Sequence, residues 1–212
     1  MTMTQQADLW SGPFGDFYQE RNSLTEEEVD RRATFLSGVF KLIYTINGSV
    51  PKSVLEIGAG QGPNLSAIRK IELENSVPIK RYATEINEKA RLKLQENVKD
   101  VEILHAIPNT PIADLVMTYG VMIHTHPAHI RDLQTKMYNA TNRWILCCEY
   151  FAPTTRPIVY RGEKDALWLD DYGGMLMRNF SLRLLGYGFS WKPITGLDNI
   201  TFWVFEKTSK MQ

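Results

Sequence analysis

Cysteine is scarce in this sequence, and long apolar runs and a leader-like start are missing. The two cysteines, Cys147 and Cys148, are neighbours inside an apolar stretch. Because a bond between adjacent cysteines is strained, we expect free core thiols and no disulfide framework. No apolar stretch reaches the roughly 18 residues of a membrane span, and residues 1–5 form neither a basic nor an apolar leader segment. These absences predict a cytoplasmic protein without a membrane partner.

The sequence also lacks an excess of either charge, because 24 Lys and Arg residues balance 24 Asp and Glu residues. No run of like charges stands out, so the broad basic surface of duplex-binding proteins is missing. This argues against nucleic acid as the substrate. No Pro-, Gly- or Ser-rich linker and no repeat divides the chain, which predicts a single domain over residues 1–212. Nothing in the sequence specifies an oligomeric state.

Glycine, in contrast, is concentrated after a short apolar run, in the segment Glu56-Ile57-Gly58-Ala59-Gly60-Gln61-Gly62. A strand that turns sharply into a helix needs glycine for positive φ angles and for close approach of a ligand. Pro63 suits the first helical position. The spacing differs from the G-x-G-x-x-G of dinucleotide-binding folds. The form E-x-G-x-G-x-G resembles the first motif of class I S-adenosylmethionine (SAM) methyltransferases, which implies SAM as the cofactor.

Strand-like and helix-like patterns alternate along the chain, which is typical of an α/β fold. We expect helices from Ser23 or Thr25 to Asn47, after Pro63, from Asn87 to Asn97, after Pro127 and over 170–180. The expected strands are 53–57, 81–85, 101–105, 114–119, 144–150, 183–191 and 201–207, the last two as an antiparallel pair. The prediction is a Rossmann-like, mostly parallel seven-stranded sheet with helices on both faces.

In such sheets, ligands bind beyond the carboxyl ends of the strands, at the point where the strand order reverses. Glu85 closes the second strand, and a carboxylate there can accept both hydroxyl hydrogens of a ribose. A solvated Glu before the Asn87 cap is the alternative. The third strand ends near Ala106, beside the expected adenine position, and the fourth ends at Tyr119.

The loop after the fourth strand contains His124, which is the candidate catalytic residue. Histidine can take a proton from a hydroxyl or amine near neutral pH while that group attacks a methyl group. A hydrogen bond from His124 to a backbone carbonyl is an equally good interpretation. His124, His126 and His129 could form a metal site, but no Cys or acidic ligand accompanies them, so we expect no metal.

Four further segments share the pattern of a narrower family. The first has the form W-x-G-x-F-G-x-x-Y-x-x-R-N, and its matching residues are Trp10, Gly12, Phe14, Gly15, Tyr18, Arg21 and Asn22. Residues 120–127 read G-V-M-I-H-T-H-P, 149–155 read E-Y-F-A-P-T-T, and 160–162 read Y-R-G. Together they resemble the methylases associated with pseudaminic acid biosynthesis, in which the second and third segments read G-V-L-I-H-I-N-P and E-Y-x-x-P-T-P.

This resemblance covers nearly the whole chain and weakens at residues 169–174. The family would have a basic pair before the first Asp there and a Glu after the glycine, so the acceptor of this protein can differ. Asp170 and Asp171 can cap a helix or hold an amine or hydroxyl of the acceptor. The resemblance implies that residues 1–22 form a lid over the cofactor, in which Arg21 pairs with the methionine carboxylate. Ordinary packing is the alternative role for its aromatic residues.

The motifs and the resemblance together imply two sets of binding residues besides His124. The predicted SAM-binding residues are Trp10, Phe14, Tyr18, Arg21, Glu56, Gly58, Ala59, Gly60, Gly62, Asn64, Glu85, Ile86, Ala106, Tyr119, Gly120 and Val121. The predicted acceptor-binding residues are Glu149, Tyr150, Tyr160 and Arg161. The planar guanidinium of Arg161 suits a carboxylate or phosphate.

The predicted function is transfer of a methyl group from SAM to an oxygen or nitrogen of a small polar metabolite, with S-adenosylhomocysteine as product. The family resemblance implies a sugar or sugar nucleotide of the nonulosonic acid type as the substrate. Three alternatives stay open: methylation of a nucleobase or nucleic acid, SAM binding without methyl transfer, and binding of another adenosine compound such as NAD.

Overall fold

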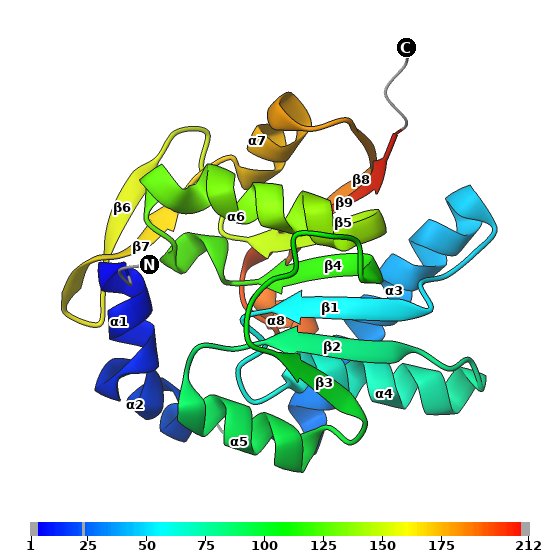
Figure 1. Ribbon diagram of the computed structural model, residues 1–212, viewed down its shortest axis with the longest axis horizontal. Helices are drawn as coiled ribbons and strands as arrows, with labels where there is room; N and C mark the ends of the chain where they lie inside the picture. The colour runs from blue at the N-terminus through cyan, green and yellow to red at the C-terminus, as the bar shows by residue number, and fades with distance from the viewer. Residues whose placement is uncertain (1–3, 23, 209–212) are drawn as a thin grey trace.

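The computed structural model describes residues 4–22 and 24–208 of the chain (Figure 1). Its main feature is a seven-stranded sheet in the order β3-β2-β1-β4-β5-β9-β8. The strands are β1 Ser53–Ile57, β2 Lys80–Thr84, β3 Val101–Leu104, β4 Ala113–Tyr119, β5 Thr141–Glu149, β8 Leu182–Ser190 and β9 Ile200–Lys207. The pairs from β3 to β5 are parallel, whereas β9 is antiparallel to both β5 and β8. The predicted fold class is therefore confirmed.

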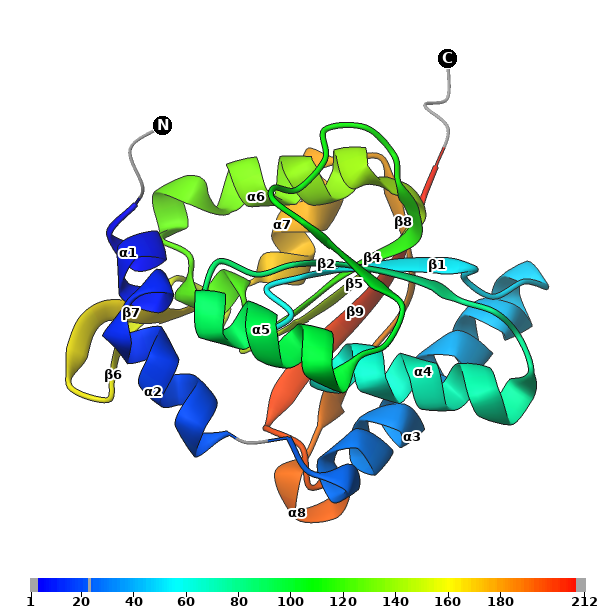
Figure 2. The same ribbon diagram turned by 60° about the horizontal axis from the view of Figure 1, so that its bottom comes forward.

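Helices cover both faces of this sheet (Figure 2). On one face lie α3 Glu26–Asn47, α4 Pro63–Asn75 and α5 Glu88–Asn97, and on the other lie α6 Pro127–Ala140 and α7 Tyr172–Asn179. Each face has its own apolar core, in which Leu36, Leu65 and Leu94 represent the first face and Ile130, Met137 and Leu176 the second. None of the helices in the described part of the chain is long and apolar enough to cross a membrane.

Several predicted helix starts are confirmed by their capping hydrogen bonds. The Thr25 hydroxyl accepts from the Glu28 backbone N–H at 3.2 Å, so α3 begins as a capping motif predicts. Ser23, the other proposed cap, lies outside the described residues. The Asn87 side chain accepts from the Ala90 N–H at 2.8 Å and starts α5. The largest boundary difference is at β5, which begins at Thr141 because this residue pairs with Ala113 ahead of a bulge.

The sequence patterns did not predict several elements, and four of these lie near the carboxyl ends of the strands. They are the helices α1 Gln5–Ser11 and α2 Pro13–Arg21 and the hairpin strands β6 Arg156–Tyr160 and β7 Glu163–Leu169. Figure 1 shows α1 beside this hairpin, and the Gln6 side-chain amide donates to the Asp165 carbonyl at 3.3 Å. Short helices and mostly exposed strands leave little apolar periodicity, which explains why they were missed.

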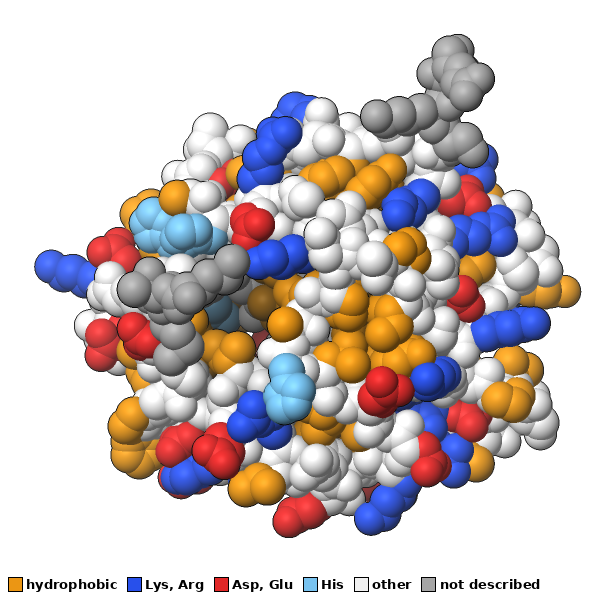
Figure 3. Space-filling view, in the orientation of Figure 1, with side chains coloured by type: hydrophobic (Ala, Val, Ile, Leu, Met, Phe, Trp, Pro, Cys, Tyr) orange, Lys and Arg blue, Asp and Glu red, His pale blue; other side chains and the backbone are white. Residues whose placement is uncertain are grey.

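The surface in the same orientation carries interspersed Lys, Arg, Asp and Glu side chains (Figure 3). This face has no broad area of one charge sign, as expected from the balanced composition. The strand order reverses between β1 and β4, because β2 and β3 follow on one side of β1, and β4 and β5 follow on its other side. Their carboxyl ends point toward α1 and α2 (Figure 1), and a ligand site is expected at that end.

Candidate functional site

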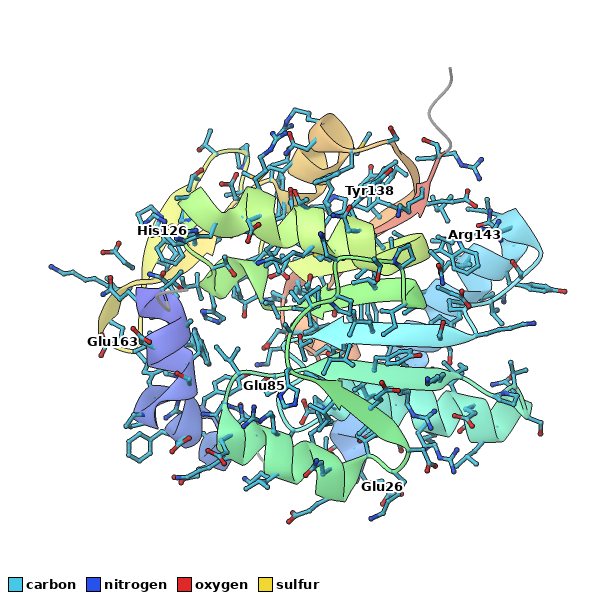
Figure 4. All side chains as sticks on the ribbon, viewed as in Figure 1. Glu26, Glu85, His126, Tyr138, Arg143 and Glu163 are labelled. Atoms are coloured by element: carbon cyan, nitrogen blue, oxygen red, sulfur yellow. The ribbon has the colours of Figure 1, made fainter. Side chains whose placement is uncertain are left out.

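A cavity of about 360 Å³ lies at the carboxyl ends of β1, β2 and β4. The glycine loop, the segment after β2, the loop after β4, the two N-terminal helices and the β6–β7 hairpin all contribute to its walls. Figure 4 places Glu85, His126 and Glu163 toward this end of the molecule and Arg143 at the opposite end of the sheet. The predicted site residues that line the cavity are Trp10, Tyr18, Glu56, Gly58, Ala59, Gly60, Asn64, Glu85, Ile86, Tyr119, Gly120, Val121, His124, Tyr150 and Tyr160.

Six predicted residues lie outside this lining: Phe14, Arg21, Gly62, Ala106, Glu149 and Arg161. Gly62 instead allows close packing, because a Cβ there would lie 2.4 Å from a Leu94 methyl group. Glu149 is buried below the loop after β4 and accepts from the backbone N–H groups of Val121 and Ile123, each at 3.2 Å. Burial raises the pKa of the Glu149 carboxyl to about 7.

The other residues outside the lining are near the surface. Arg21 ends α2 with an exposed side chain, and Ala106 is exposed after β3. Arg161 is exposed at the tip of the β6–β7 hairpin, where its φ of 52° fits a tight turn. Phe14 packs on the cavity residues Trp10 and Tyr160, with ring centroids 5.3 Å and 6.1 Å away. Phe14 therefore contacts residues that line the cavity but does not line it itself.

The glycine loop follows β1 in a conformation that brings its backbone close to the cavity. Gly58 has a φ of 67°, and a Cβ on it would lie 2.7 Å from a Val121 methyl group. The Gly60 N–H donates to Glu85 Oε2 at 2.7 Å, and the Asn87 N–H donates to Glu85 Oε1 at 2.8 Å. Glu85 therefore joins the glycine loop to the segment after β2. Burial raises the pKa of its carboxyl, and these backbone hydrogen bonds oppose the shift.

A chain of polar side chains runs from α3 to the end of β1. Arg32 donates to Glu28 Oε1 at 2.8 Å and to Asn64 Oδ1 at 2.8 Å, and its guanidinium lies 4.6 Å from the centre of the Tyr119 ring. Asn64 in turn donates to Glu56 Oε1 at 2.5 Å. Burial raises the pKa of the Glu56 carboxyl to about 8. The carboxyl group of Glu56 is thus held in place, and its ionisation is unfavourable unless a cation binds beside it.

Four buried polar atoms of cavity-lining residues have no hydrogen-bond partner among the described residues. They are Trp10 Nε1, Gln19 Oε1, Glu56 Oε2 and the Tyr119 hydroxyl. Buried polar groups are nearly always paired, because an unpaired one costs roughly 1–3 kcal/mol. Both donors and acceptors are left free here, which fits a ligand that offers both types of group.

His124 lies in the short 3-10 helix Met122–His124 between β4 and α6. Its Nδ1 is 2.7 Å from the Ala166 carbonyl oxygen. A carbonyl can only accept, so Nδ1 carries the proton and Nε2 has a free lone pair. Burial lowers the pKa of the imidazole to about 4, opposed by the bond to Ala166. Its ring contacts those of Trp10 and Tyr160, with centroids 4.4 Å and 5.1 Å away.

The N-terminal helices are hydrogen-bonded to the same two segments that Glu85 joins. The Gln61 side-chain amide donates to the carbonyls of Gln19, at 3.1 Å, and Asn22. The Asn87 side-chain amide donates to Asp16 Oδ1 at 2.9 Å and to the Trp10 carbonyl at 3.2 Å. The covering helices are therefore tied directly to the glycine loop and to the segment after β2.

Sequence reasoning missed several lining residues, of which Arg32 is the most informative. Arg32 lies three residues after Val29 and four residues before Leu36, both predicted core positions, and so shares their helical face. A charged residue on a buried face was therefore a usable signal. Gln61 lies between the predicted residues Gly60 and Gly62, and its position in that motif was a usable signal as well. No comparable pattern marks Asp198, which reaches the cavity only through the tertiary fold.

Metal ligands do not gather in the described part of the chain, where no three His, Cys, Asp or Glu side chains come together as a possible set. The His126 and His129 rings are 6.0 Å apart on α6, and His126 contacts Trp168 at a centroid distance of 5.4 Å. The Nδ1 atom of His126 accepts from the Ala128 N–H at 3.2 Å and caps the helix.

No protein-family model and no curated protein matches the sequence significantly. Among solved structures, the 1,6-didemethyltoxoflavin-N1-methyltransferase of Burkholderia thailandensis, with S-adenosylhomocysteine bound, is similar with a TM-score of 0.67 and 15% identity over 99% of this chain and 93% of that one. The plantazolicin methyltransferase, also with this compound, has a TM-score of 0.62 and 14% identity over 96% and 94% of the chains. The magnesium protoporphyrin IX methyltransferase of Synechocystis has a TM-score of 0.61 and 14% identity over 95% and 98%. The chain thus has the Rossmann-like class I methyltransferase fold.

Proposed function

We propose that this protein is a SAM-dependent methyltransferase that modifies an oxygen or nitrogen of a small polar metabolite. The observation that carries the proposal is the cavity at the carboxyl ends of β1, β2 and β4, in which a glycine loop, Glu85 and unpartnered buried polar atoms converge. The fold neighbours bind S-adenosylhomocysteine in their own structures, which supports SAM as the cofactor here.

The residues of the cavity fit the polar groups of SAM. Glu56 Oε2 is buried and has no hydrogen-bond partner among the residues that the structure describes, so it would bind the ammonium group. Glu85 has both oxygens fixed by backbone N–H groups and keeps lone pairs for the two ribose hydroxyls. Ile86 would contact the adenine, and Gly58 and Gly60 leave room for close approach of the methionine chain.

Arg32 is a better candidate than Arg21 for the methionine carboxylate. Arg21 is exposed, whereas Arg32 lines the cavity and is linked through Asn64 to Glu56. Its hydrogen bonds to Glu28 and Asn64 use only part of its five N–H donors. An arginine beside Glu56 would let one end of the cavity bind the ammonium and carboxylate groups together.

His124 would act on the acceptor. SAM supplies an activated methyl group when bound, and the chain must hold the acceptor in line, exclude water and receive its proton. The bond from Nδ1 to Ala166 fixes the tautomer in which Nε2 can accept that proton. Trp10 and Tyr160 both pack against the His124 ring and would keep water away from it.

For the acceptor we propose a sugar or sugar nucleotide of the nonulosonic acid type. The four segments that resemble the pseudaminic acid-associated methylases support this substrate. Tyr150 and Tyr160 line the cavity and would contact the acceptor, whereas Glu149 would act by holding the loop before His124. Arg161 would reach an acidic group only outside the cavity, from the hairpin tip.

The experiment is to incubate the purified protein with SAM and CMP-activated nonulosonic acids or their precursors and to analyse the mixture by mass spectrometry. S-Adenosylhomocysteine and a product heavier by one methylene should appear together. Calorimetric titration with SAM alone separates the two parts of the proposal. SAM binding without any methylated product would refute the acceptor class, and failure to bind SAM would refute the cofactor assignment.

A further inference from the structure

An open groove of about 630 Å³ adjoins the cavity on the side of the short helix α8 Lys192–Thr195. Its lining residues are Tyr150, Phe151, Leu169, Phe189, Lys192, Asp198, Asn199 and Thr201. Tyr150 and Asp198 also line the cavity, so the two spaces meet at these residues. A molecule whose reacting end is in the cavity could therefore extend into the groove.

Phe189 lies in β8, and Phe151 lies just beyond the end of β5, which is two strands away in the sheet. In the sheet, Thr201 of β9 pairs with Glu149 of β5 on one side and with Phe189 of β8 on the other. Phe151 follows Glu149 by two residues and forms an isolated parallel bridge with Asp170. Strands β5 and β8 are two spacings apart, about 10 Å. That width suits one flat ring between two phenyl groups, since offset or edge contacts place ring centroids about 4.5–7 Å apart.

Both phenylalanines are unusually exposed for residues that line a concavity. Phe151 is 48% exposed and Phe189 is 59% exposed, and neither belongs to the two apolar cores, although the Phe151 ring centre lies 6.2 Å from that of Trp203. The rim is polar, with Lys192 Nζ 3.5 Å from Asp198 Oδ1 and the Lys192 backbone N–H donating to Asn199 at 2.8 Å. Apolar walls with a few polar groups at the edge are typical of small-molecule sites.

We propose that the methyl acceptor carries a planar aromatic ring joined to an anionic group, and that this ring binds between Phe151 and Phe189. This inference rests on the proposed function for the cavity and narrows its acceptor class to compounds such as nucleotide-linked metabolites. The ring stacks on the phenyl groups, the anionic group reaches Lys192, and the reacting atom passes Tyr150 and Asp198 into the cavity.

The test uses a matched pair of probes on the protein saturated with S-adenosylhomocysteine. Uridine 5′-monophosphate has a planar base, whereas ribose 5-phosphate has the same sugar and phosphate without it. The methyl signals of Leu169 and Thr201, which line the groove, are followed by NMR. Uridine 5′-monophosphate should shift both signals saturably, and ribose 5-phosphate should bind about ten-fold more weakly or not at all.

Two variants separate stacking from general surface binding. The double variant Phe151→Ala/Phe189→Ala should weaken uridine 5′-monophosphate about ten-fold and leave the affinity for S-adenosylhomocysteine unchanged. Tyr187→Ala is the matched control, because Tyr187 is a 72% exposed aromatic residue of the same strand that does not line the groove. This control should bind the probe as the wild type does.

Three results would overturn the inference. One is no shift of Leu169 and Thr201 with uridine 5′-monophosphate, and another is an equal shift with ribose 5-phosphate. The third is a dimer in analytical ultracentrifugation that dissociates in the double variant, which would assign the groove to a second copy of the chain. If the probe binds the groove while S-adenosylhomocysteine does not bind the protein, the groove site stands and the function proposed for the cavity fails.

Discussion

At the scale of single residues, the buried carboxyl group of Glu56 makes the stability of the folded protein depend on pH. Burial raises the pKa of its carboxyl from 4.5 to about 8, so the folded protein binds a proton there that the unfolded chain releases. Between about pH 5 and pH 8 the folded state holds more protons, and the contribution of Glu56 to the free energy of unfolding falls as the pH rises. A bound ammonium group would reverse the preference by stabilising the carboxylate.

We predict that S-adenosylhomocysteine binds more tightly as the pH rises from about 6 to about 7.5, because Glu56 must lose its proton to pair with the ammonium group. Calorimetric titrations in two buffers with different ionisation enthalpies measure this release directly. Glu56→Gln should bind about ten-fold more weakly at pH 7.5 and should release fewer protons. The same proton release in Glu56→Gln and the wild type would contradict the role given to Glu56.

His124 gives a second prediction at this scale. His124→Ala should lower turnover by about 100-fold, the lower end of general-base contributions, and leave the affinity for SAM nearly unchanged. Because burial lowers the pKa of the imidazole to about 4, the turnover of the wild type should show no inflection from this group above about pH 6. Steady-state kinetics and SAM calorimetry measure both effects. A large loss of SAM binding in His124→Ala would instead indicate a structural role.

The sequence predicted the glycine and acidic residues that line the cavity, but it did not predict the arginine that lines it. Glu56, Gly58, Gly60 and Glu85 follow directly from the ends of predicted strands, where backbone geometry leaves few alternatives. Arg32 comes from a helix that precedes the sheet, and its position at the cavity depends on how α3 packs against α4. A family motif favoured Arg21, whose side chain is exposed in the structure.

At the scale of elements, α1 and α2 cover the cavity and are tied to the glycine loop and to the segment after β2 through Gln61 and Asn87. The corner between these helices is tight, because a Cβ on Gly15 would lie 1.9 Å from the Trp10 carbonyl oxygen. Trp10 and Gln19 each have a buried polar atom without a partner in the described part of the chain, and ligand contacts to these atoms would favour the covered state. The lid predicted for residues 1–22 therefore remains our proposal for the described part, residues 4–22.

We predict that Gly15→Ala separates α1 from α2 and weakens S-adenosylhomocysteine binding about ten-fold, since overpacking forces backbone shifts. Gly38→Ala in α3 is the control, because a Cβ there meets nothing within 4 Å, and it should bind normally. In the wild type, S-adenosylhomocysteine should protect residues 4–22 from limited proteolysis, and Gly15→Ala should lose much of this protection. Cleavage that does not depend on the ligand in the wild type would contradict the lid.

Amphipathic elements of the sheet and its covering helices were predictable, because their burial produces regular apolar spacing, as in α3 with Ala33, Leu36 and Ile43. The β6–β7 hairpin lacks that signal, since β6 is exposed over most of its length. Its place beside α1 depends on contacts such as that of Gln6 with Asp165, which are 159 positions apart. Such distant pairs leave no local pattern in the sequence.

At the scale of the whole molecule, the sheet gathers residues from distant parts of the chain at one edge. Glu85 holds the glycine loop and the segment after β2 together through two backbone N–H groups. Strands β1 and β2 are buried and regular, so the position of Glu85 is fixed before any ligand arrives. Preorganisation of this kind lets ligand contacts add directly to the stability of the fold.

We therefore predict that S-adenosylhomocysteine at about 100 times its Kd raises the unfolding free energy by about 2.7 kcal/mol and Tm by about 5–10 °C. Glu85→Ala should lose most of this shift, because the ribose hydroxyls lose their acceptor. Glu102→Ala is the control, since Glu102 is an exposed residue of β3 paired only with Lys80, at 3.2 Å, among the described residues. The Glu102→Ala variant should keep the full ligand-induced rise in Tm, as measured by differential scanning calorimetry. Because Glu85→Ala also leaves two backbone N–H groups unpaired, its ligand-free Tm should fall as well. If Glu85→Ala showed a ligand-induced Tm shift as large as that of the wild type, Glu85 would not contact the ligand. Its role would then be limited to joining the glycine loop to the segment after β2.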